Sequence, residues 1–258
     1  GPPMVVGIGK DQNFVASDVQ ALIAYTNQFI YLNDREIVQL NRESIKLFSS
    51  QGVAIDRKPI TLNWSPELVE KQGFAHYMLK EIYEQPRAVA MAIEPHIHNQ
   101  LVRLKYVRFN EQDLNNIDQL DSEKDWKNTE NILKNIERVF IIACGTSFYA
   151  GQIGKYLLEN FAHLPVETDI ASEFRYRNPL IPKNSLVLTI SQSGETADTL
   201  AAIRKKKKKG ALTLSLCNVK NSTIDREAHG HLYMNAGPEI GVASTKAFTT
   251  TLAVLNIF

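Results

Sequence analysis

The sequence predicts an α/β protein in which a three-layer αβα domain with a parallel sheet follows a β-rich segment. From residue 138 onward, short apolar runs alternate with helical patterns, as in βαβ units whose sheet is covered on both faces. Before residue 66, short alternating runs separated by turn residues indicate antiparallel strands instead. We therefore expect three parts: a β-rich segment at 1–72, a helical linker at 73–104, and the parallel-sheet domain at 105–258.

Composition excludes several classes of protein. Of the 258 residues, 44% are apolar and 22% are charged, which is typical of a globular protein with a proper core. The formal net charge of +1 gives no reason to expect nucleic acid or a membrane surface as a partner. No apolar run reaches the ~20 residues that span a bilayer, and no signal-peptide pattern is present. We expect a cytoplasmic protein in which Cys144 and Cys217 are reduced thiols.

The β-rich segment is expected to contain five strands, at residues 4–8, 28–33, 36–40, 45–48 and 53–55. Asn33 and Asp34 form a turn signal, so the strand at 36–40 is expected to pair with the strand before it. Residues 13–18 are small or polar and predict a loop. The acidic residues of this segment are scattered, which suits turns and caps rather than a catalytic set.

The linker is expected to be helical. A helix is predicted over 74–85, ended by Pro86, and a further turn or two over 89–92 is expected to end before Pro95. The residues expected to dock this helix as an apolar stripe are Tyr77, Met78, Ile82 and Tyr83.

Three histidines in the same region, His76, His96 and His98, raise the alternative of a metal site. His96 and His98 are two positions apart and do not face each other on a helix. No cysteine or acidic residue is suitably spaced to complete a ligand set. We therefore expect neither a metal nor a cofactor.

The parallel-sheet domain is expected to open with a polar, helical lead-in over 106–135. Its predicted strands follow at 139–143, 166–170, 186–190, 211–217 and 232–234, and its predicted helices at 146–161, 196–206 and 244–258. Periodicity assigns inward positions to Phe148, Ile153, Leu157 and Phe161 in the first helix, and to Ala197, Leu200 and Ile203 in the second.

The stretch Ser191-Gln192-Ser193-Gly194-Glu195-Thr196 joins the third of these strands to a helix. The first N–H groups of a helix lack internal partners and carry the positive end of its dipole, so such a turn suits a phosphate. The alternative is an ordinary N-cap made by serine or threonine.

Two further loops, at 143–147 and 239–246, also place hydroxyls at the start of a helix. In parallel sheets such loops meet at the carboxyl ends of the strands, where ligands bind. None of the three has the glycine spacing of a dinucleotide site or of a P-loop. They predict a site for a monophosphate attached to a polyhydroxyl body.

Six consecutive cations occupy residues 204–209, directly before Gly210. A patch for RNA or DNA is one interpretation. We favour a solvated last helical turn that the dipole stabilises and that Gly210 ends.

Four stretches together closely resemble one family: Cys-Gly-Thr-Ser at 144–147, Ala-Ser-Glu-Phe-Arg-Tyr-Arg at 171–177, and the stretches at 191–199 and 239–249. The family is that of the glucosamine-6-phosphate synthases, the glutamine:fructose-6-phosphate amidotransferases, whose synthase half consists of sugar isomerase (SIS) domains. Residues 5–9 and 29–32 resemble the end of the family's glutaminase, an N-terminal-nucleophile hydrolase. Residues 76–86 resemble the segment between its two halves.

The resemblance implies that the chain takes part in making glucosamine 6-phosphate from fructose 6-phosphate and glutamine. It implies that the phosphate is held by Ser147, Ser191, Gln192, Ser193 and Thr196. The sugar is expected to contact Cys144, Gly145, Thr146, Val242 and Ser244.

The resemblance also implies what this chain does not supply. Gly1 stands where the family has its nucleophilic cysteine, and the second SIS domain, with its acid–base residues and lysine, is not recognisable. We expect a fragment without catalytic residues of its own, taken from a homodimeric enzyme that uses glutamine only at full length. Two alternatives stay open: a non-catalytic SIS module that senses a sugar phosphate, and a plain α/β scaffold with capped helices.

Overall fold

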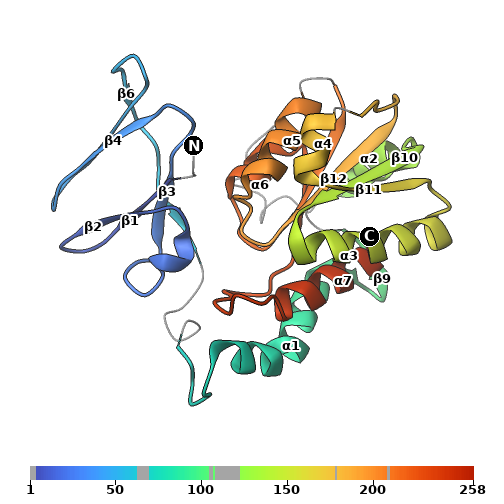
Figure 1. Ribbon diagram of the computed structural model, residues 1–258, viewed down its shortest axis with the longest axis horizontal. Coiled ribbons are helices and arrows are strands. Elements are labelled where there is room, and N and C mark those ends of the chain that lie inside the picture. Colours follow the sequence, from blue (N-terminus) through green and yellow to red (C-terminus); the bar gives the residue numbers. More distant parts are fainter. Residues whose placement is uncertain (1–3, 63–69, 105–106, 108–122, 178, 208–209) are drawn as a thin grey trace. The chain divides into compact units, whose positions relative to one another are not determined.

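The computed structural model describes residues 4–62, 70–104, 107, 123–177, 179–207 and 210–258. The chain divides into two compact units, Gly1–Lys80 and Glu81–Phe258 (Figure 1). The boundary falls inside helix α1, Tyr77–Ile93. Among the described residues, no helix combines the length and the apolar character that crossing a membrane requires.

The front unit is built from two antiparallel sheets, with strand orders β2-β1-β3-β7 and β4-β5-β6. The strands of the first sheet are β1 (Val5–Ile8), β2 (Asn13–Ala16), β3 (Gln28–Tyr31) and β7 (Ile60–Thr61). Those of the second are β4 (Ile37–Leu40), β5 (Ile45–Phe48) and β6 (Ala54–Ile55). An apolar core joins the two sheets through Val6, Ile30, Leu32 and Leu47. The predicted antiparallel pairing is confirmed.

Two predictions for the front unit are wrong. The segment predicted to be a loop, residues 13–18, contains strand β2, which pairs with β1 across a tight turn closed by the bond from Gly9 N to Gln12 O. Strand β4 pairs with β5, with Ile37 opposite Phe48, and not with β3 as the turn signal at Asn33 suggested. Turn residues mark a change of direction, and they do not decide which strand becomes the partner.

Helix α1 continues through Pro86 and ends at Ile93, so the predicted stop is wrong. Proline has no N–H for the carbonyl four residues earlier. That carbonyl, on Ile82, accepts instead from the side-chain amide of Gln85 at 3.1 Å. The predicted docking stripe is also wrong, because Met78, Ile82 and Tyr83 are exposed, whereas the buried positions of the helix include Glu81, Ala88 and Ala92.

Two short elements follow α1: a 3-10 turn at Glu94–His96 and a hairpin of β8 (Ile97–His98) and β9 (Leu101–Val102). His96 is buried, and His76 and His98 are exposed. In the described part of the chain, no three His, Cys, Asp or Glu side chains are grouped so that they could hold a metal ion. Most of the predicted lead-in over 106–135 lies outside the described residues, and its last part is helix α2 (Glu123–Lys134).

The second unit contains a five-stranded parallel sheet with the order β11-β10-β12-β13-β14. Its strands are β10 (Arg138–Ala143), β11 (Val166–Ile170), β12 (Ser185–Ser191), β13 (Leu212–Cys217) and β14 (Gly230–Tyr233). Its helices are α3 (Gly145–Leu157), α4 (Ala171–Arg177), α5 (Ala197–Lys207), α6 (Thr223–Glu227) and α7 (Lys246–Ile257). The predicted α/β fold and parallel sheet are confirmed.

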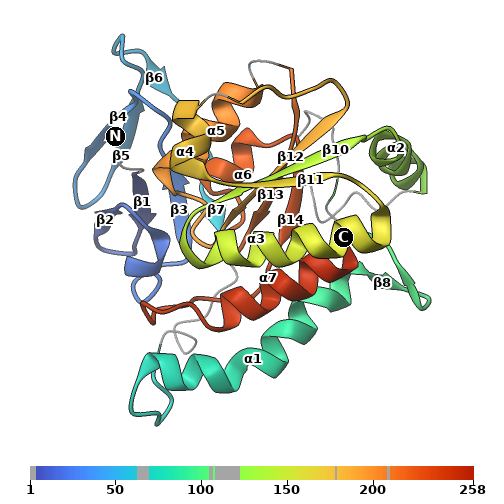
Figure 2. The ribbon, with the colours of Figure 1, turned by 45° about the vertical axis from the view of Figure 1, so that its right-hand side comes forward.

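Helices cover both faces of this sheet, as Figure 2 shows: α3 and α7 lie on one face, and α4, α5 and α6 on the other. The alternation of side chains along each strand explains why both faces are apolar. In β10, Val139 and Ile141 enter the core under α3 and α7, and Phe140 and Ile142 enter the core under α4 and α5.

The inward faces of two helices match the prediction only in part: Phe148 and Leu157 of α3 and Leu200 of α5 pack against the core, and Ile203 of α5 is buried. In α3 the buried residues are Ala150, Gly151 and Gly154, whereas Ile153 and, in the π-helical turn Leu158–Ala162 that follows, Phe161 are exposed. A Cβ on Gly151 would lie 2.7 Å from Ile141 Cγ2, so the close approach of helix and sheet requires small residues. In α5 the exposed residue is Ala197, and the buried positions are Thr199, Ala202, Ile203 and Lys206.

The cationic run at the end of α5 is not a solvated turn, which corrects the prediction. Lys206 is 1% exposed, and its Nζ donates to the carbonyl of Pro179 at 2.9 Å while lying 4.6 Å from the centre of the Phe174 ring. Lys205 Nζ donates to the carbonyl of Arg175, also at 2.9 Å. These cations therefore fasten the end of α4 to α5 through backbone carbonyls. Residues 208–209 lie outside the described part.

Candidate functional site

The order of the parallel sheet marks the space between β10 and β12 as the place where a ligand crevice is expected. The chain runs from β10 outward to β11 and then returns across β10 to β12, so the direction of winding reverses between these two strands. In open α/β sheets ligands bind at the carboxyl ends of the strands beside such a reversal. Ala143 and Ile190 are register partners near those ends, so the loops that follow them are neighbours.

The loop after β10 leads directly into α3. Cys144 is half-buried and extended, with φ −121° and ψ 157°, and its side chain makes no capping hydrogen bond. Gly145 follows with φ +57°, a conformation that favours glycine. Thr146 is exposed and Ser147 is half-buried in the first turn of the helix. The loop thus presents two hydroxyls beside the positive end of α3.

The loop after β12 is organised by its own hydroxyl groups. Ser191 Oγ accepts from the N–H of Gly194 at 3.0 Å and lies 3.0 Å from Thr196 Oγ1. Ser193 Oγ accepts from the N–H of Glu195 at 3.2 Å. Ser191 is buried, whereas Gln192, Ser193 and Thr196 are half-buried. The turn is therefore a preformed set of neutral donors and acceptors that directly precedes α5.

The turn at 191–196 rests on α6 and the residues just before it. The carbonyl of Gly194 accepts from Ile224 N at 2.9 Å, and Glu195 Oε1 accepts from Thr223 N at 2.8 Å. The Glu195 carboxylate is thus directed toward α6. Gly194 has φ +69°, and a Cβ at this position would overlap the side chain of Ser222. Close packing thereby fixes the distance between this turn and the residues just before α6.

A buried acid, Asp225, holds α6 in place. Asp225 accepts hydrogen bonds from Ser215 Oγ at 2.9 Å, Tyr233 Oη at 3.0 Å and the N–H of Asn221 at 2.8 Å, and lies 2.8 Å from His231 Nδ1. Burial alone would raise the pKa of Asp225, but His231 and these donors outweigh burial and lower that pKa. A charged, fully bonded carboxylate therefore ties α6 to β13 and β14.

Cys217 lies beneath the same turn and is fully buried. Burial, and to a lesser degree the nearby Asp225 carboxylate, raises the pKa of its thiol well above the ordinary value. Cys144 and Cys217 are both free cysteines, as predicted. The Cys217 thiol is therefore a packing group and not a nucleophile.

The third predicted loop, before α7, reaches the same edge of the sheet, because α3 and α7 run in parallel with Gly154 against Leu255. This loop contains its own anion. Glu239 Oε1 accepts from the N–H groups of Thr245 at 2.9 Å and Ala247 at 3.1 Å, and Glu239 Oε2 accepts from Ser244 Oγ at 3.0 Å. Ser244 is thus engaged within the loop.

The structure brings most of the predicted residues together. Those in the loops after β10 and β12 lie on neighbouring loops beside the reversal of winding, whereas Val242 projects fully exposed from the loop before α7.

Sequence reasoning missed the roles of Glu239, Asn218 and Glu81. An acid shortly before a helix start is a capping signal that could have revealed Glu239. Nothing in the sequence points to Asn218, which accepts from Ala236 N at 2.8 Å and donates to the carbonyl of Gly237 at 2.6 Å.

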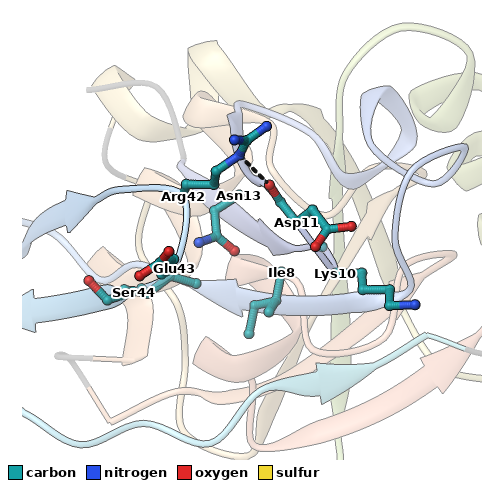
Figure 3. Close-up of a pocket in the computed structure, with 9 residues that line it drawn as sticks. Ile8, Lys10, Asp11, Asn13, Arg42, Glu43 and Ser44 are labelled. Atoms are coloured by element: carbon teal, nitrogen blue, oxygen red, sulfur yellow. Dashed lines mark hydrogen bonds between the residues drawn. The ribbon is translucent and has the colours of Figure 1, made fainter.

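A separate cavity of about 800 Å³ lies in the front unit (Figure 3). Side chains of both signs line it, and Arg42 Nε donates to the carbonyl of Asp11 at 3.1 Å. Asn13 Nδ2 donates to the carbonyl of Asn41 at 2.8 Å. None of the predicted site residues lines this cavity, so it is distinct from the crevice of the parallel sheet.

Fold and strand order together indicate the class of the second unit. Residues 132–258 match the SIS domain family, and this part of the chain is a SIS domain.

Over both units the chain is similar to the aminotransferases named glutamine–fructose-6-phosphate aminotransferase [isomerizing]. It is 43% identical over 256 residues to the one from Clostridium acetobutylicum and 46% identical over 257 residues to the one from Thermus thermophilus. Each alignment covers 99% of this chain and 39% of the relative, so the chain spans well under half the length of these proteins.

A solved structure gives the same result. The C-terminal domain of glucosamine-fructose-6-phosphate aminotransferase from Francisella tularensis superimposes with a TM-score of 0.63 at 42% identity. The superposition covers 73% of this chain and 48% of that domain. The chain thus matches the part of these enzymes that contains a SIS domain.

Proposed function

We propose that this chain is a part of a glutamine–fructose-6-phosphate aminotransferase and that its SIS domain holds fructose 6-phosphate for conversion to glucosamine 6-phosphate. The observation that carries the proposal is the pair of hydroxyl-rich loops, 144–147 and 191–196, that flank the reversal of winding in the sheet. The phosphate would lie against Ser147, Ser191, Gln192, Ser193 and Thr196. The sugar would contact Cys144, Gly145, Thr146, Val242 and Ser244.

The chemistry of the two loops supports a phosphate monoester. Helix N-termini and hydroxyls bind a doubly charged group without a buried cation, and neutral donors also suit the hydroxyls of a sugar. The β-rich front unit, which we assign to the end of an N-terminal-nucleophile glutaminase, favours the aminotransferase over a stand-alone sensing module. The full enzyme would be a cytoplasmic homodimer that takes its ammonia from glutamine.

Calorimetry on the 258-residue chain tests the substrate. We expect fructose 6-phosphate to bind and fructose to give no heat at the same concentration, because the phosphate supplies most of the contacts. Ser193→Ala should weaken binding about tenfold, since one hydrogen bond to a charged group is lost. Ser185→Ala, at the opposite end of β12, is the matched control and should bind as the wild type does. Equal binding of the two sugars would refute the phosphate site.

The proposal also assigns no catalytic residue to this chain. Purified chain given fructose 6-phosphate and glutamine, or ammonia in place of glutamine, should form no glucosamine 6-phosphate. Formation of the amino sugar above the level of a buffer control would show that the acid–base groups lie within residues 1–258.

A further inference from the structure

A buried acid in α1 reaches the loop before α7 across 160 residues of sequence. Glu81 is 2% exposed. Its Oε1 accepts from the N–H of Ile240 at 2.6 Å and from the N–H of Gly241 at 3.1 Å, and its Oε2 lies 3.2 Å from Gly241 N. One carboxylate therefore satisfies two consecutive backbone donors that belong to no helix or strand.

The same face of α1 holds α7 through separate contacts. Glu84, three residues after Glu81, forms an ion pair of 2.7 Å with Lys246 Nζ, and the side chain of Lys246 is 4% exposed. Gln85, four residues after Glu81, hydrogen-bonds the hydroxyl of Thr249. Positions three and four apart share one helix face, and α1 and α7 lie side by side in both ribbon views (Figure 2). Glu81 is thus one of several contacts, and the only one of these that reaches the loop.

The loop that Glu81 holds is short between its two anchors. Ile240 and Gly241 are bound to Glu81, and Ser244 and Thr245 are bound to Glu239. Between these anchors Val242 is fully exposed, so its position depends on the backbone and not on packing of its own side chain.

We infer that Glu81 is a positioning residue for the sugar: it fixes residues 240–244, the loop from which Val242 projects, before the ligand arrives. The inference rests on the proposed function, because Val242 is there assigned to the sugar. A loop held in its binding conformation loses less conformational entropy on binding, which raises affinity without a new contact. Glu81 does not touch the 191–196 turn in this arrangement, so the phosphate should be held independently of it.

Two substitutions separate this role from a general loss of structure. Glu81→Ala removes both acceptor oxygens, whereas Glu81→Gln keeps the shape of the side chain and one acceptor oxygen. The ion pair of Glu84 with Lys246 keeps α1 docked in both variants. Glu94→Gln is the matched control, because Glu94 is exposed in the turn just after α1.

Amide hydrogen exchange without ligand tests the positioning step. Glu81→Ala should accelerate exchange at Ile240 and Gly241 at least tenfold, and should leave the core amides of β12 unchanged. Glu81→Gln should lie between Ala and wild type, and Glu94→Gln should match wild type. Unchanged exchange at both amides in Glu81→Ala would overturn the inference.

Ligand titrations test the consequence, with fructose 6-phosphate and inorganic phosphate followed by backbone amide shifts. Glu81→Ala should weaken fructose 6-phosphate about tenfold, because the freed loop must then be ordered on binding, and change phosphate affinity by less than twofold. Equal loss of both ligands, or loss of neither, would overturn the inference. If the wild type binds neither, the proposed function fails, and the exchange result still decides whether Glu81 holds the loop.

Discussion

The helices α5 and α7, which begin at one edge of the parallel sheet, differ in what surrounds their first N–H groups. The first N–H groups of any helix lack internal partners. Before α7, the carboxylate of Glu239 accepts from the hydroxyls of Ser244 and Thr245 and from two backbone N–H groups. Before α5, the hydroxyls of the turn at 191–196 bond within the turn, and the carboxylate of Glu195 binds α6 instead.

The difference teaches how to distinguish a cap from an anion site. Both helix starts follow hydroxyl-rich loops, so the hydroxyls alone do not discriminate. A carboxylate that accepts from the first N–H groups of a helix occupies them, whereas hydroxyls that bond within their own turn leave those groups to a ligand. Asp198, in the first turn of α5, pairs with Arg175 instead. Position in the sheet agrees, because the turn before α5 lies beside the reversal of winding and the loop before α7 follows the edge strand β14.

The largest expected effect concerns the glycines of the two crevice loops. Gly194→Ala should reduce the free energy of unfolding by about 4 kcal/mol, because the new Cβ overlaps Ser222 at a φ that disfavours side chains. Gly145→Ala should cost only about 1 kcal/mol, since no atom lies within 4 Å of its added Cβ. Urea unfolding followed by circular dichroism measures both, and equal losses would contradict the packing of the turn on α6.

The next effect removes the internal anion of the α7 start. Glu239→Ala should lower the free energy of unfolding by about 3 kcal/mol, because several hydrogen bonds to a buried carboxylate are lost together. Glu239→Gln keeps one acceptor oxygen and should cost about 1 kcal/mol. Calorimetric unfolding of both variants makes the comparison. An alanine variant as stable as the glutamine variant would show that the cap contributes little.

The third prediction places a carboxylate at Ser193, in the turn before α5. Ser193→Asp puts a carboxylate into the turn before α5, and should weaken fructose 6-phosphate binding at least about 100-fold, roughly 2.7 kcal/mol, by repulsion of the phosphate. Ser193→Asn has a similar size without the charge and should lose less than about tenfold. Titration calorimetry measures both. Similar losses in the two variants would mean that the phosphate lies elsewhere.

The parallel-sheet unit was the more predictable part of the fold. Its strands, such as β12, are continuous apolar runs buried on both faces, a pattern that is hard to mistake. The face of each helix was less predictable. In α3 the close approach to Ile141 selects Gly151 and Gly154, so the buried stripe is small rather than apolar. Periodicity of large side chains found Phe148 and Leu157, which pack against the core, but it missed these glycines and placed the exposed Ile153 and Phe161 inward.

The part of the candidate site whose residues directly follow a strand could be predicted from the sequence. The residues that hold a site loop from a distant part of the sequence could not. Ser191 and Ser193 were predicted from the strand–turn–helix pattern, and the structure shows them in the turn between β12 and α5. Glu81 could not be found, because its partners lie 160 residues away and are backbone groups with no sequence signature. The stop predicted at Pro86 failed for a local reason, since the Gln85 amide replaces the missing N–H.

The smallest expected effect tests a carboxylate paired near the surface of the front unit. Glu36 makes a two-bonded ion pair with Arg57, with both N–O distances 2.6 Å, and accepts from Asn33 N at 2.7 Å. The hydrogen bond from Arg57 outweighs burial and lowers the pKa of Glu36. A lowered carboxyl pKa contributes stability that is present above the unfolded-state pKa and is lost as pH falls through the folded-state pKa.

Glu36→Gln should therefore cost about 1 kcal/mol at pH 7, as a well-formed pair near the surface does. The difference from wild type should shrink as pH falls from the unfolded-state pKa of a glutamate, about 4.3, through the lower folded-state pKa of Glu36. Urea unfolding between pH 7 and pH 3 measures it, with Lys58→Gln as an exposed single-charge control. A difference that stays constant over this range would assign the effect to packing of the side chain and not to its charge. Such a result would separate this pair from Glu239, whose role at α7 depends on the carboxylate itself.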